Sequence, residues 1–190
     1  MERISLRTAN LELVPPTPED EDAVFAACQD AETQNWVPIP SPYLRENARE
    51  SVTTHSIKTW EEDTEYTWTI RVDGTLAGIV GLYRVANGSA DLGFWMVPDY
   101  RGKGLLTEAC NAVIDFAFKK APAGLGVVRL GWNAYAGNFG SARVAQKLGF
   151  QFEGTARLGS ALRGELRDDW GASLLASDER SEHQWSILAK

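Results

Sequence analysis

The chain has 190 residues, 44% of them hydrophobic, and a formal net charge of −7. This length and apolar content suffice for one globular domain with a sizeable core, whereas no apolar run approaches the roughly 20 residues that a membrane-spanning helix needs. The acidic balance argues against nucleic acid as a partner and the N-terminus lacks the apolar core of a secretory signal, so we expect a cytoplasmic protein that binds neither nucleic acid nor membrane.

The negative charge is concentrated in the N-terminal third. Residues 1–65 contain 14 Asp and Glu against 5 Lys and Arg, whereas residues 66–190 contain 12 against 14. Such a region would attract a cationic substrate such as an amine, or it serves solubility alone. With two Cys and two His far apart in the sequence, the spacing of a metal site is absent, and we expect no metal.

The first predicted elements are a short strand over 11–14 and a helix that begins near Thr17. Thr17 supplies a capping hydroxyl, Pro18 suits the first turn, and the two acids that follow favour the positive end of the helix. A second helix is expected over about 44–60, after a segment whose three prolines exclude regular helix. Trp36 and Tyr43 lie at the two ends of that segment, and each is a candidate to anchor the loop on the core.

The middle of the chain predicts three strands in an antiparallel meander. Strands are expected over 66–72 and 76–85, around the turn at Asp73-Gly74, and a third, apolar and aromatic strand ends at Val97. From Leu105 an apolar face repeats at helical spacing and predicts a helix to about 120. A strand over 127–132 should then pair in parallel across this helix.

The junction between the third strand and its helix contains Gly102 and Gly104, flanked by Arg101 and Lys103. The first N–H groups of a helix have no partner within it, and glycines let a bulky ligand approach them, so a phosphate or pyrophosphate would fit there. The two cations add positive charge. On these residues alone, an ordinary turn with two glycines is an equally good interpretation.

A second motif follows at Asn138, where a turn opens a helix that Gly149 ends as a C-cap. A final hairpin is predicted over 152–158 and 169–175, and the charged segment 177–190 follows it. The two motifs, Val97-Pro98-x-x-Arg101-Gly102-x-Gly104 and Asn138-x-x-Ser141-x-x-x-x-x-Lys147-Leu148-Gly149-Phe150, resemble those of the GCN5-related N-acetyltransferases (GNAT), in particular the RimJ/RimL-like branch that acetylates ribosomal-protein N-termini.

The resemblance implies an α+β fold with a mixed, mostly antiparallel sheet of about seven strands, splayed into a V and flanked by about four helices. It implies a single domain over 1–176, with 177–190 as a tail outside it. It places the segment with Trp36 and Tyr43 over the acceptor side of the cleft, so each of the two lines the substrate pocket or anchors the loop. It also implies that acetyl-CoA is the co-substrate. The residues expected to bind it are Met96, Val97, Arg101, Gly102, Lys103, Gly104, Leu105, Leu106, Asn138 and Ser141. Leu106 departs from the Gly or Ala that the broad family prefers.

The resemblance also suggests the residues that carry the chemistry. Asp91, on the central strand, is the candidate general base, or a solvent-facing residue at the strand entry. Ser141 is the candidate acid for the leaving thiolate, or a helix cap; Ala145 stands where much of the family has a Tyr. The branch's second carboxylate is replaced by Ser160, and Glu165 and Asp168 are the candidate substitutes. Main-chain N–H groups near Met96 and Val97 would polarise the carbonyl.

The predicted function is transfer of an acetyl group from acetyl-CoA to a primary amine, by direct attack in a ternary complex. The acceptor is a protein N-terminus or a small amine, and the protein is a monomer or homodimer. Two alternatives stay open: a non-catalytic module that senses acyl-CoA, and a transferase for another acyl group such as succinyl.

Overall fold

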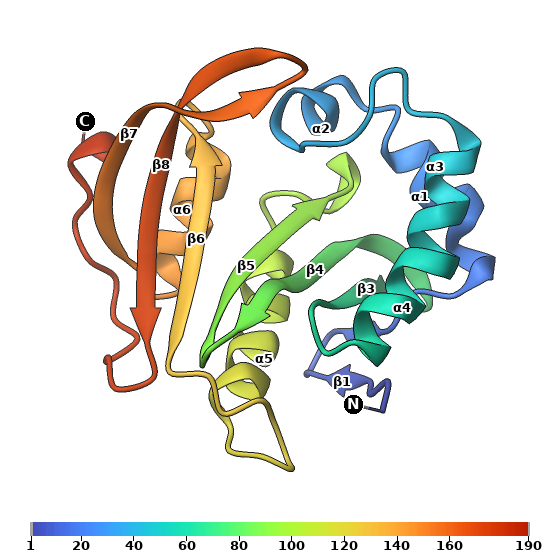
Figure 1. Ribbon diagram of the computed structural model, residues 1–190, viewed down its shortest axis with the longest axis horizontal. Coiled ribbons are helices and arrows are strands. Elements are labelled where there is room, and N and C mark those ends of the chain that lie inside the picture. The colour runs from blue at the N-terminus through green and yellow to red at the C-terminus, as the bar shows by residue number, and fades with distance from the viewer. Residues whose placement is uncertain (1, 190) are drawn as a thin grey trace.

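One mixed sheet is the frame of the structure, a computed structural model that describes residues 2–189 (Figure 1). Its strands are β1 (Leu6–Arg7), β2 (Glu12–Val14), β3 (Tyr66–Val72), β4 (Thr75–Ala86), β5 (Ser89–Met96), β6 (Arg129–Tyr135), β7 (Gln151–Leu162) and β8 (Glu165–Leu175). Within the described residues the order is β1-β2-β3-β4-β5-β6-β8-β7. Neighbours are antiparallel except β5 and β6, which are parallel. The expected α+β fold is confirmed; the strand beyond the expected seven is β1, too short for its pattern to show.

The two halves of the sheet separate at its centre. β5 and β6 pair only from Ser89↔Arg129 to Asp91↔Gly131, although β5 continues to Met96 and β6 to Tyr135. In Figure 1 the two strands diverge upward from their paired ends. The predicted V-shaped splay is therefore present, and it leaves facing strand edges without a partner strand, where a ligand can enter.

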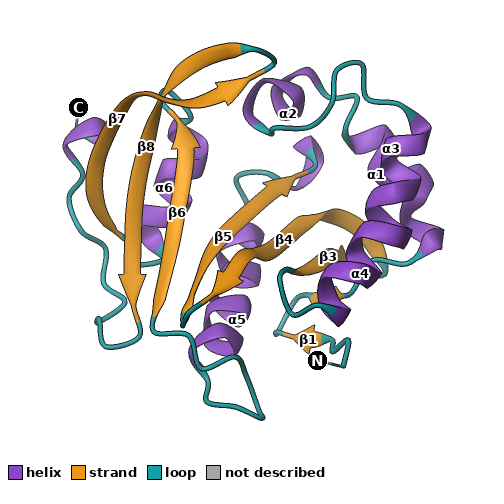
Figure 2. Cartoon of the chain, in the orientation of Figure 1, coloured by secondary structure: helices purple, strands orange, loops and turns teal. Residues whose placement is uncertain are grey.

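Helices cover both faces of the sheet. They are α1 (Glu21–Ala27), α2 (Ala31–Trp36), α3 (Arg45–Glu50), α4 (Ser56–Glu61), α5 (Leu105–Phe118) and α6 (Phe139–Lys147). The strands pass in front of α5 and α6 in Figure 2, whereas α4 passes in front of β3. The predicted helix over 44–60 is α3 and α4 joined by a π-helical segment, Ser51–His55. Among residues 2–189, no helix is both long and apolar enough to span a membrane.

The short helix α2 was not expected, because it ends at the proline segment and has only six residues. It begins after Asp30, whose carboxylate accepts the Thr33 N–H at 2.9 Å and so caps the first turn. In Figure 1, α2 lies between the tip of the β7–β8 hairpin and α1. It therefore sits at the open end of the splay.

The main core lies between the sheet and its helices and is rich in aromatic rings. Trp60 and Trp68 are fully buried and meet edge to face, with ring centroids 5.2 Å apart. From α5 this core takes Ala109, Cys110, Val113, Ile114, Phe116 and Ala117, close to the predicted apolar face. A smaller cluster under α1 and α3 contains Cys28, Tyr43 and Ile79. Each large apolar side chain buried here stabilises the fold by about 1.5–3 kcal/mol.

The C-terminal segment packs on this core, although the sequence analysis set 177–190 apart from the domain. Trp185 is only 2% exposed, its indole N–H donates to the Phe150 carbonyl at 3.1 Å, and its ring lies 5.5 Å from that of Trp132. The segment has few apolar residues, so its composition indicates a solvated tail. Trp185 is its most buried residue, and Ile187 and Leu188 also pack against the core.

We therefore expect Trp185→Ala to lower the free energy of unfolding by about 3–5 kcal/mol, the usual cost of truncating a buried tryptophan. Thermal melts followed by circular dichroism would measure the loss. Arg180→Ala is the matched control, because it removes surface contacts of the same segment, a hydrogen bond to Asn111 and an ion pair with Asp115; such a pair is worth about 0–1 kcal/mol. Equal melting temperatures for the two variants would show that the segment adds nothing to the domain.

Candidate active site

A cavity of about 920 Å³ occupies the splay between β5 and β6. Its lining includes residues of the glycine loop, of α6, of α2 and of the segment 37–39. Three of the seven tryptophans line it, Trp36, Trp95 and Trp132, each from a different element. A volume of this size can hold a ligand of the size of a cofactor.

The glycine loop presents bare main chain to the cavity. Gly102 (φ +75°) and Gly104 (φ +80°) adopt the left-handed conformation, and a Cβ on either would meet no atom within 4 Å. The first bond of α5 runs from the Glu108 N–H to the Gly104 carbonyl, so the three preceding N–H groups have no partner within the helix. Leu106 lines the cavity and packs on the core. The loop is therefore not plugged by its own side chains.

The two cations predicted to serve this loop both have partners within the protein. The Arg101 guanidinium turns to α2, where it pairs with Asp30 and Glu32, and the Lys103 ammonium lies 5.6 Å from the centre of the Tyr100 ring. The cations that do line this side are Arg143 and Lys147 of α6. Sequence reasoning missed them. Their i, i+4 spacing on the helix face opposite the buried alanines was the available signal.

The main-chain donors at the end of β5 divide between the two edges of the strand. The Val97 N–H donates to the Ala77 carbonyl at 2.8 Å, so it is already engaged. Since N–H groups alternate in direction along an antiparallel strand, the Met96 N–H faces the splay. The Met96 carbonyl on that edge accepts the Arg101 Nε–H at 2.8 Å. Of the two expected donors, Met96 therefore has the geometry to polarise a carbonyl, and Val97 does not.

Asp91 lies at the apex of the V and lines the cavity. Its carboxylate is paired with Arg84, which has a positive φ of +51° in an irregular part of β4. Across the apex, a Cβ on Gly131 would collide with Asp91 Oδ1. The side chain is 22% exposed, so it is not a solvent-facing residue at the strand entry. It is a cavity carboxylate that already has a counter-ion.

A second carboxylate, Asp169 of β8, faces the same cavity and was missed from the sequence. It is 8% exposed and accepts the Asn133 side-chain N–H at 3.1 Å. Burial raises the pKa of Asp169 above its ordinary value, although hydrogen bonds from Ser160 and Asn133 act in the opposite direction. A buried cavity carboxyl with a raised pKa is a candidate general base.

The substitutes considered for the carboxylate missing at Ser160 occupy other positions. Asp168 is exposed and accepts the Leu158 N–H at 2.8 Å, which holds the hairpin. Glu165 begins β8 at the hairpin turn and is exposed. Consecutive residues of a strand face opposite sides, so only one of Asp168 and Asp169 can face the cavity. The sequence shows the pair, but the register of β8 decides which one.

The Ser141 hydroxyl accepts a hydrogen bond and leaves its own hydrogen available to a ligand. Its Oγ accepts the Trp132 indole N–H at 3.1 Å, and its main-chain N–H donates to Asn138 Oδ1 at 3.1 Å. The helix cap is thus Asn138, and the hydroxyl hydrogen of Ser141 has no acceptor among the described side chains that would claim it. Both residues line the cavity. Ser141 can therefore donate a proton into the cavity, as its candidate role requires.

Of the two aromatic residues predicted for the substrate side, the structure brings one to the cavity. Trp36 ends α2 and lines the wall. Tyr43 is 6% exposed and packs in the smaller core cluster with Cys28, where burial raises its pKa. Tyr43 is therefore a loop anchor, the other interpretation that its sequence position allowed.

Comparison with known proteins agrees with this architecture. A sequence model described as "Acetyltransferase (GNAT) domain" matches residues 10–151. The chain belongs to the GNAT family. The predicted enzyme class, an acyl-CoA-dependent N-acetyltransferase, is thereby confirmed at the level of the family, and the curated relatives bear N-acetyltransferase names.

Individual relatives of this GNAT chain share about a third of their aligned residues with it or fewer. YdaF of Bacillus subtilis, provisionally named a ribosomal N-acetyltransferase, is 34% identical over 112 residues, which cover 58% of this chain and 59% of that protein. YjcK of the same organism, a probable N-acetyltransferase, is 32% identical over 142 residues, which cover 72% of this chain and 76% of YjcK. A structure of RimL, a ribosomal L7/L12 alpha-N-protein acetyltransferase in complex with coenzyme A, has a TM-score of 0.81 at 18% identity, covering 90% and 98% of the two chains.

Coenzyme A fits the GNAT chain at the glycine loop. The pyrophosphate would be held by the loop N–H groups, in the open space where a Cβ on Gly102 or Gly104 would lie, at the positive end of α5. Arg143 and Lys147 face this space from α6. Among residues 2–189, no group of three or more His, Cys, Asp or Glu is arranged to hold a metal ion.

Proposed function

We propose that the chain transfers an acetyl group from acetyl-CoA to a primary amine, by direct attack in a ternary complex. The observation that supports this most is one cavity whose lining combines a bare main-chain turn, a buried carboxyl and a serine hydroxyl that can donate its hydrogen. When bound, acetyl-CoA supplies a thioester that is already reactive toward amines, so positioning provides much of the acceleration.

We assign the roles by geometry. Asp169 takes the proton that the acceptor ammonium must lose, directly or through one water molecule. The Met96 N–H faces the splay and stabilises negative charge that develops on a carbonyl oxygen there. Ser141 donates its hydroxyl proton to a departing sulfur anion, while the Trp132 indole N–H holds its oxygen in place. Asp91, already paired with Arg84, is the second candidate for the base.

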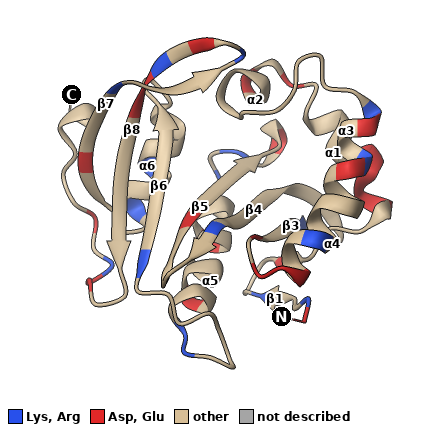
Figure 3. Ribbon diagram, in the orientation of Figure 1, with Lys and Arg blue, Asp and Glu red and all other residues tan. Residues whose placement is uncertain are grey.

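The acceptor side suits a cationic amine. Glu65, Asp91 and Asp169 line the cavity, and in Figure 3 acidic residues gather on the ribbon of α1 and of the loop between α4 and β3. We propose a protein N-terminal amine as acceptor, because YdaF and RimL bear names of ribosomal acetyltransferases. A small amine, such as a polyamine or aminoglycoside, is the alternative. Acetyl rather than succinyl transfer, a cytoplasmic location and a monomer or homodimer remain parts of the proposal.

A turnover assay tests the proposal. Acetyl-CoA and succinyl-CoA are each offered with peptides that have a free N-terminus, spermidine and an aminoglycoside, and released coenzyme A is detected as free thiol. Amine-dependent thiol release with acetyl-CoA supports the proposal. Tight coenzyme A binding without amine-dependent release from any acceptor would favour the non-catalytic sensor.

We expect Ser141→Ala to lower kcat by about 10²-fold, the lower end of the range for general acid–base catalysis. Its coenzyme A affinity should stay within about twofold, because the cap of α6 uses the main-chain N–H of residue 141, which the variant retains. Steady-state kinetics and calorimetric coenzyme A titration separate the two effects. An unchanged kcat would reduce Ser141 to a partner of Trp132.

A further inference from the structure

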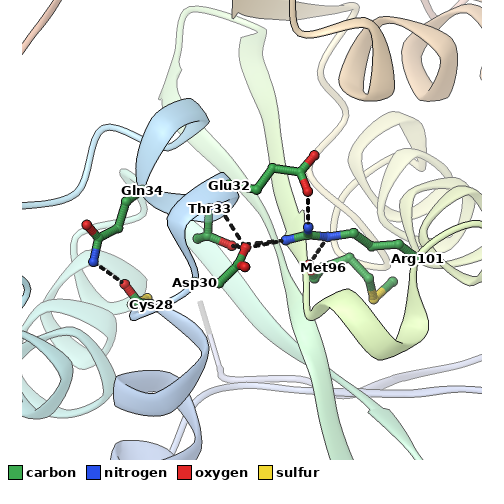
Figure 4. Close-up of polar contacts among 7 residues, drawn as sticks. All are labelled: Cys28, Asp30, Glu32, Thr33, Gln34, Met96 and Arg101. Carbon is green, nitrogen blue, oxygen red and sulfur yellow. Dashed lines mark hydrogen bonds and ion pairs between the residues drawn. The ribbon is translucent and has the colours of Figure 1, made fainter.

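The Arg101 side chain donates hydrogen bonds to other groups of the protein. Its Nε–H donates to the Met96 carbonyl at 2.8 Å, Nη1 to Glu32 at 2.5 Å, and Nη2 to Asp30 at 2.9 Å and to the Thr33 hydroxyl at 3.1 Å. Figure 4 shows the guanidinium between the end of β5 and the first turn of α2. Every nitrogen of the group is engaged, and two carboxylates outweigh its single charge. Four of its five N–H groups thus donate to the protein, and the guanidinium is committed mainly to α2 and β5.

Asp30 is the centre of these contacts. One oxygen, Oδ2, accepts the Thr33 N–H, the Thr33 hydroxyl and Arg101 Nη2, each at 2.9 Å. Burial raises the pKa of this carboxyl, but hydrogen bonds from Thr33 and Arg101 outweigh it and hold the pKa below its usual range. The same oxygen therefore caps α2 and binds it to the glycine loop. Charge-assisted bonds of this kind are about twice as strong as neutral ones.

The other end of α2 is held by the opposite half of the sheet. From the β7–β8 hairpin, Arg163 donates to the Gln34 carbonyl at 2.6 Å and Arg167 to the Asn35 carbonyl at 3.5 Å. The helix thus bridges the open end of the V, with Arg101 on the β5 side and the two hairpin arginines on the β6 side. From this helix, Thr33 and Trp36 line the cavity.

We propose that Arg101 is a positioning residue that couples the coenzyme A loop to the acceptor wall. Gly102 follows it directly in the loop, and its side chain fixes both α2 and the Met96 peptide. Ordering of the loop by coenzyme A therefore orders α2, and with it Trp36 on the acceptor side. The acceptor part of this inference rests on the proposed transfer function; the coupling itself does not.

Hydrogen–deuterium exchange with coenzyme A alone tests the coupling without turnover. In the wild type, coenzyme A should slow exchange over Ala31–Trp36. In Arg101→Ala this protection should be lost, while the coenzyme A dissociation constant stays within about threefold, because main-chain groups hold the pyrophosphate. Arg49→Ala is the matched control, since Arg49 makes a two-bond ion pair with Glu21 away from the cavity. This control should behave as wild type in both readouts.

Two further variants keep the test decisive if Arg101→Ala is poorly folded. Asp30→Asn keeps an oxygen to cap α2 but loses the charge that binds Arg101, and it should reduce the protection. Arg101→Lys keeps the charge but cannot bond Met96, Asp30 and Glu32 together, so it should behave as Arg101→Ala. A lysine that restores protection would overturn the proposal. So would protection that persists in Arg101→Ala, or a loss of coenzyme A affinity there as large as that in Gly104→Trp.

The kinetic arm uses the best acceptor from the amine panel. Coupling of two sites usually changes affinity by about 5–150-fold, so Arg101→Ala should raise the acceptor KM about tenfold while the Kd for coenzyme A barely changes. An unchanged acceptor KM would overturn the acceptor part. If no amine is turned over even by the wild type, the proposed function fails, whereas the exchange experiment still decides the coupling.

Discussion

Asp169→Asn is expected to lower kcat by about 10²–10⁴-fold, the range that a general base contributes. The carboxyl is buried in the cavity, and its pKa is raised by that burial. Only the ionised form can accept the acceptor's proton. Below its pKa the carboxyl is protonated, so kcat/KM should fall as the pH drops through a value above the ordinary pKa of an aspartate. The asparagine variant should lose this acid limb, and pH-rate profiles of both proteins measure it.

Asp168→Asn makes the same chemical change one residue away and is the control. Asp168 is exposed and caps the hairpin main chain, so its loss should leave kcat within about threefold, as for surface substitutions generally. Asp91→Asn tests the second candidate. A large fall in the kcat of Asp91→Asn, with Asp169→Asn nearly active, would identify Asp91 as the general base.

Gly104→Trp is expected to weaken coenzyme A binding by at least about 10²-fold while the protein stays folded. The residue has a φ of +80° and open space beyond its Cα, so an indole there would fill the position of the pyrophosphate. A left-handed L-residue costs about 1–2 kcal/mol, less than the usual 5–15 kcal/mol of folding stability. Calorimetric titration with coenzyme A measures the affinity, and circular dichroism checks the fold.

Gly74→Trp is a closely matched control. Gly74 has a φ of +79°, a Cβ there would also meet no atom within 4 Å, and it lies in the β3–β4 turn outside the cavity lining. Its backbone strain should equal that of Gly104→Trp, with coenzyme A affinity unchanged. If Gly104→Trp bound coenzyme A as tightly as this control, the glycine loop would not be part of the coenzyme A site.

The features that the sequence predicted well are those encoded within a few neighbouring residues. The glycine loop is one: two glycines between a strand and a helix are sufficient to predict left-handed turns and free N–H groups, and both are present. The cap at Asn138 is another. The splay was predicted only from the family resemblance, because the residues at which β5 and β6 separate have no local sequence signature.

The features that sequence reasoning missed depend on contacts between distant parts of the chain. Arg101 was assigned to phosphate, but its acceptors lie about 70 residues earlier, on a helix that was not expected. The choice between Asp168 and Asp169 depends on register shifts between β7 and β8. Trp185 shows the same limit, since the groups that it contacts, the Trp132 ring and the Phe150 carbonyl, lie far from it in the sequence.

The three cavity tryptophans give the protein a built-in optical reporter. Trp36, Trp95 and Trp132 occupy the acceptor wall, the central strand and the neighbourhood of Ser141, whereas Trp60 and Trp68 are sealed in the core. Coenzyme A and the acceptor should therefore change the emission of different cavity indoles, whereas the emission of the buried indoles should stay constant. Single Trp→Phe replacements would assign the signal to each position, so the order in which the two substrates bind can be followed in real time without a label.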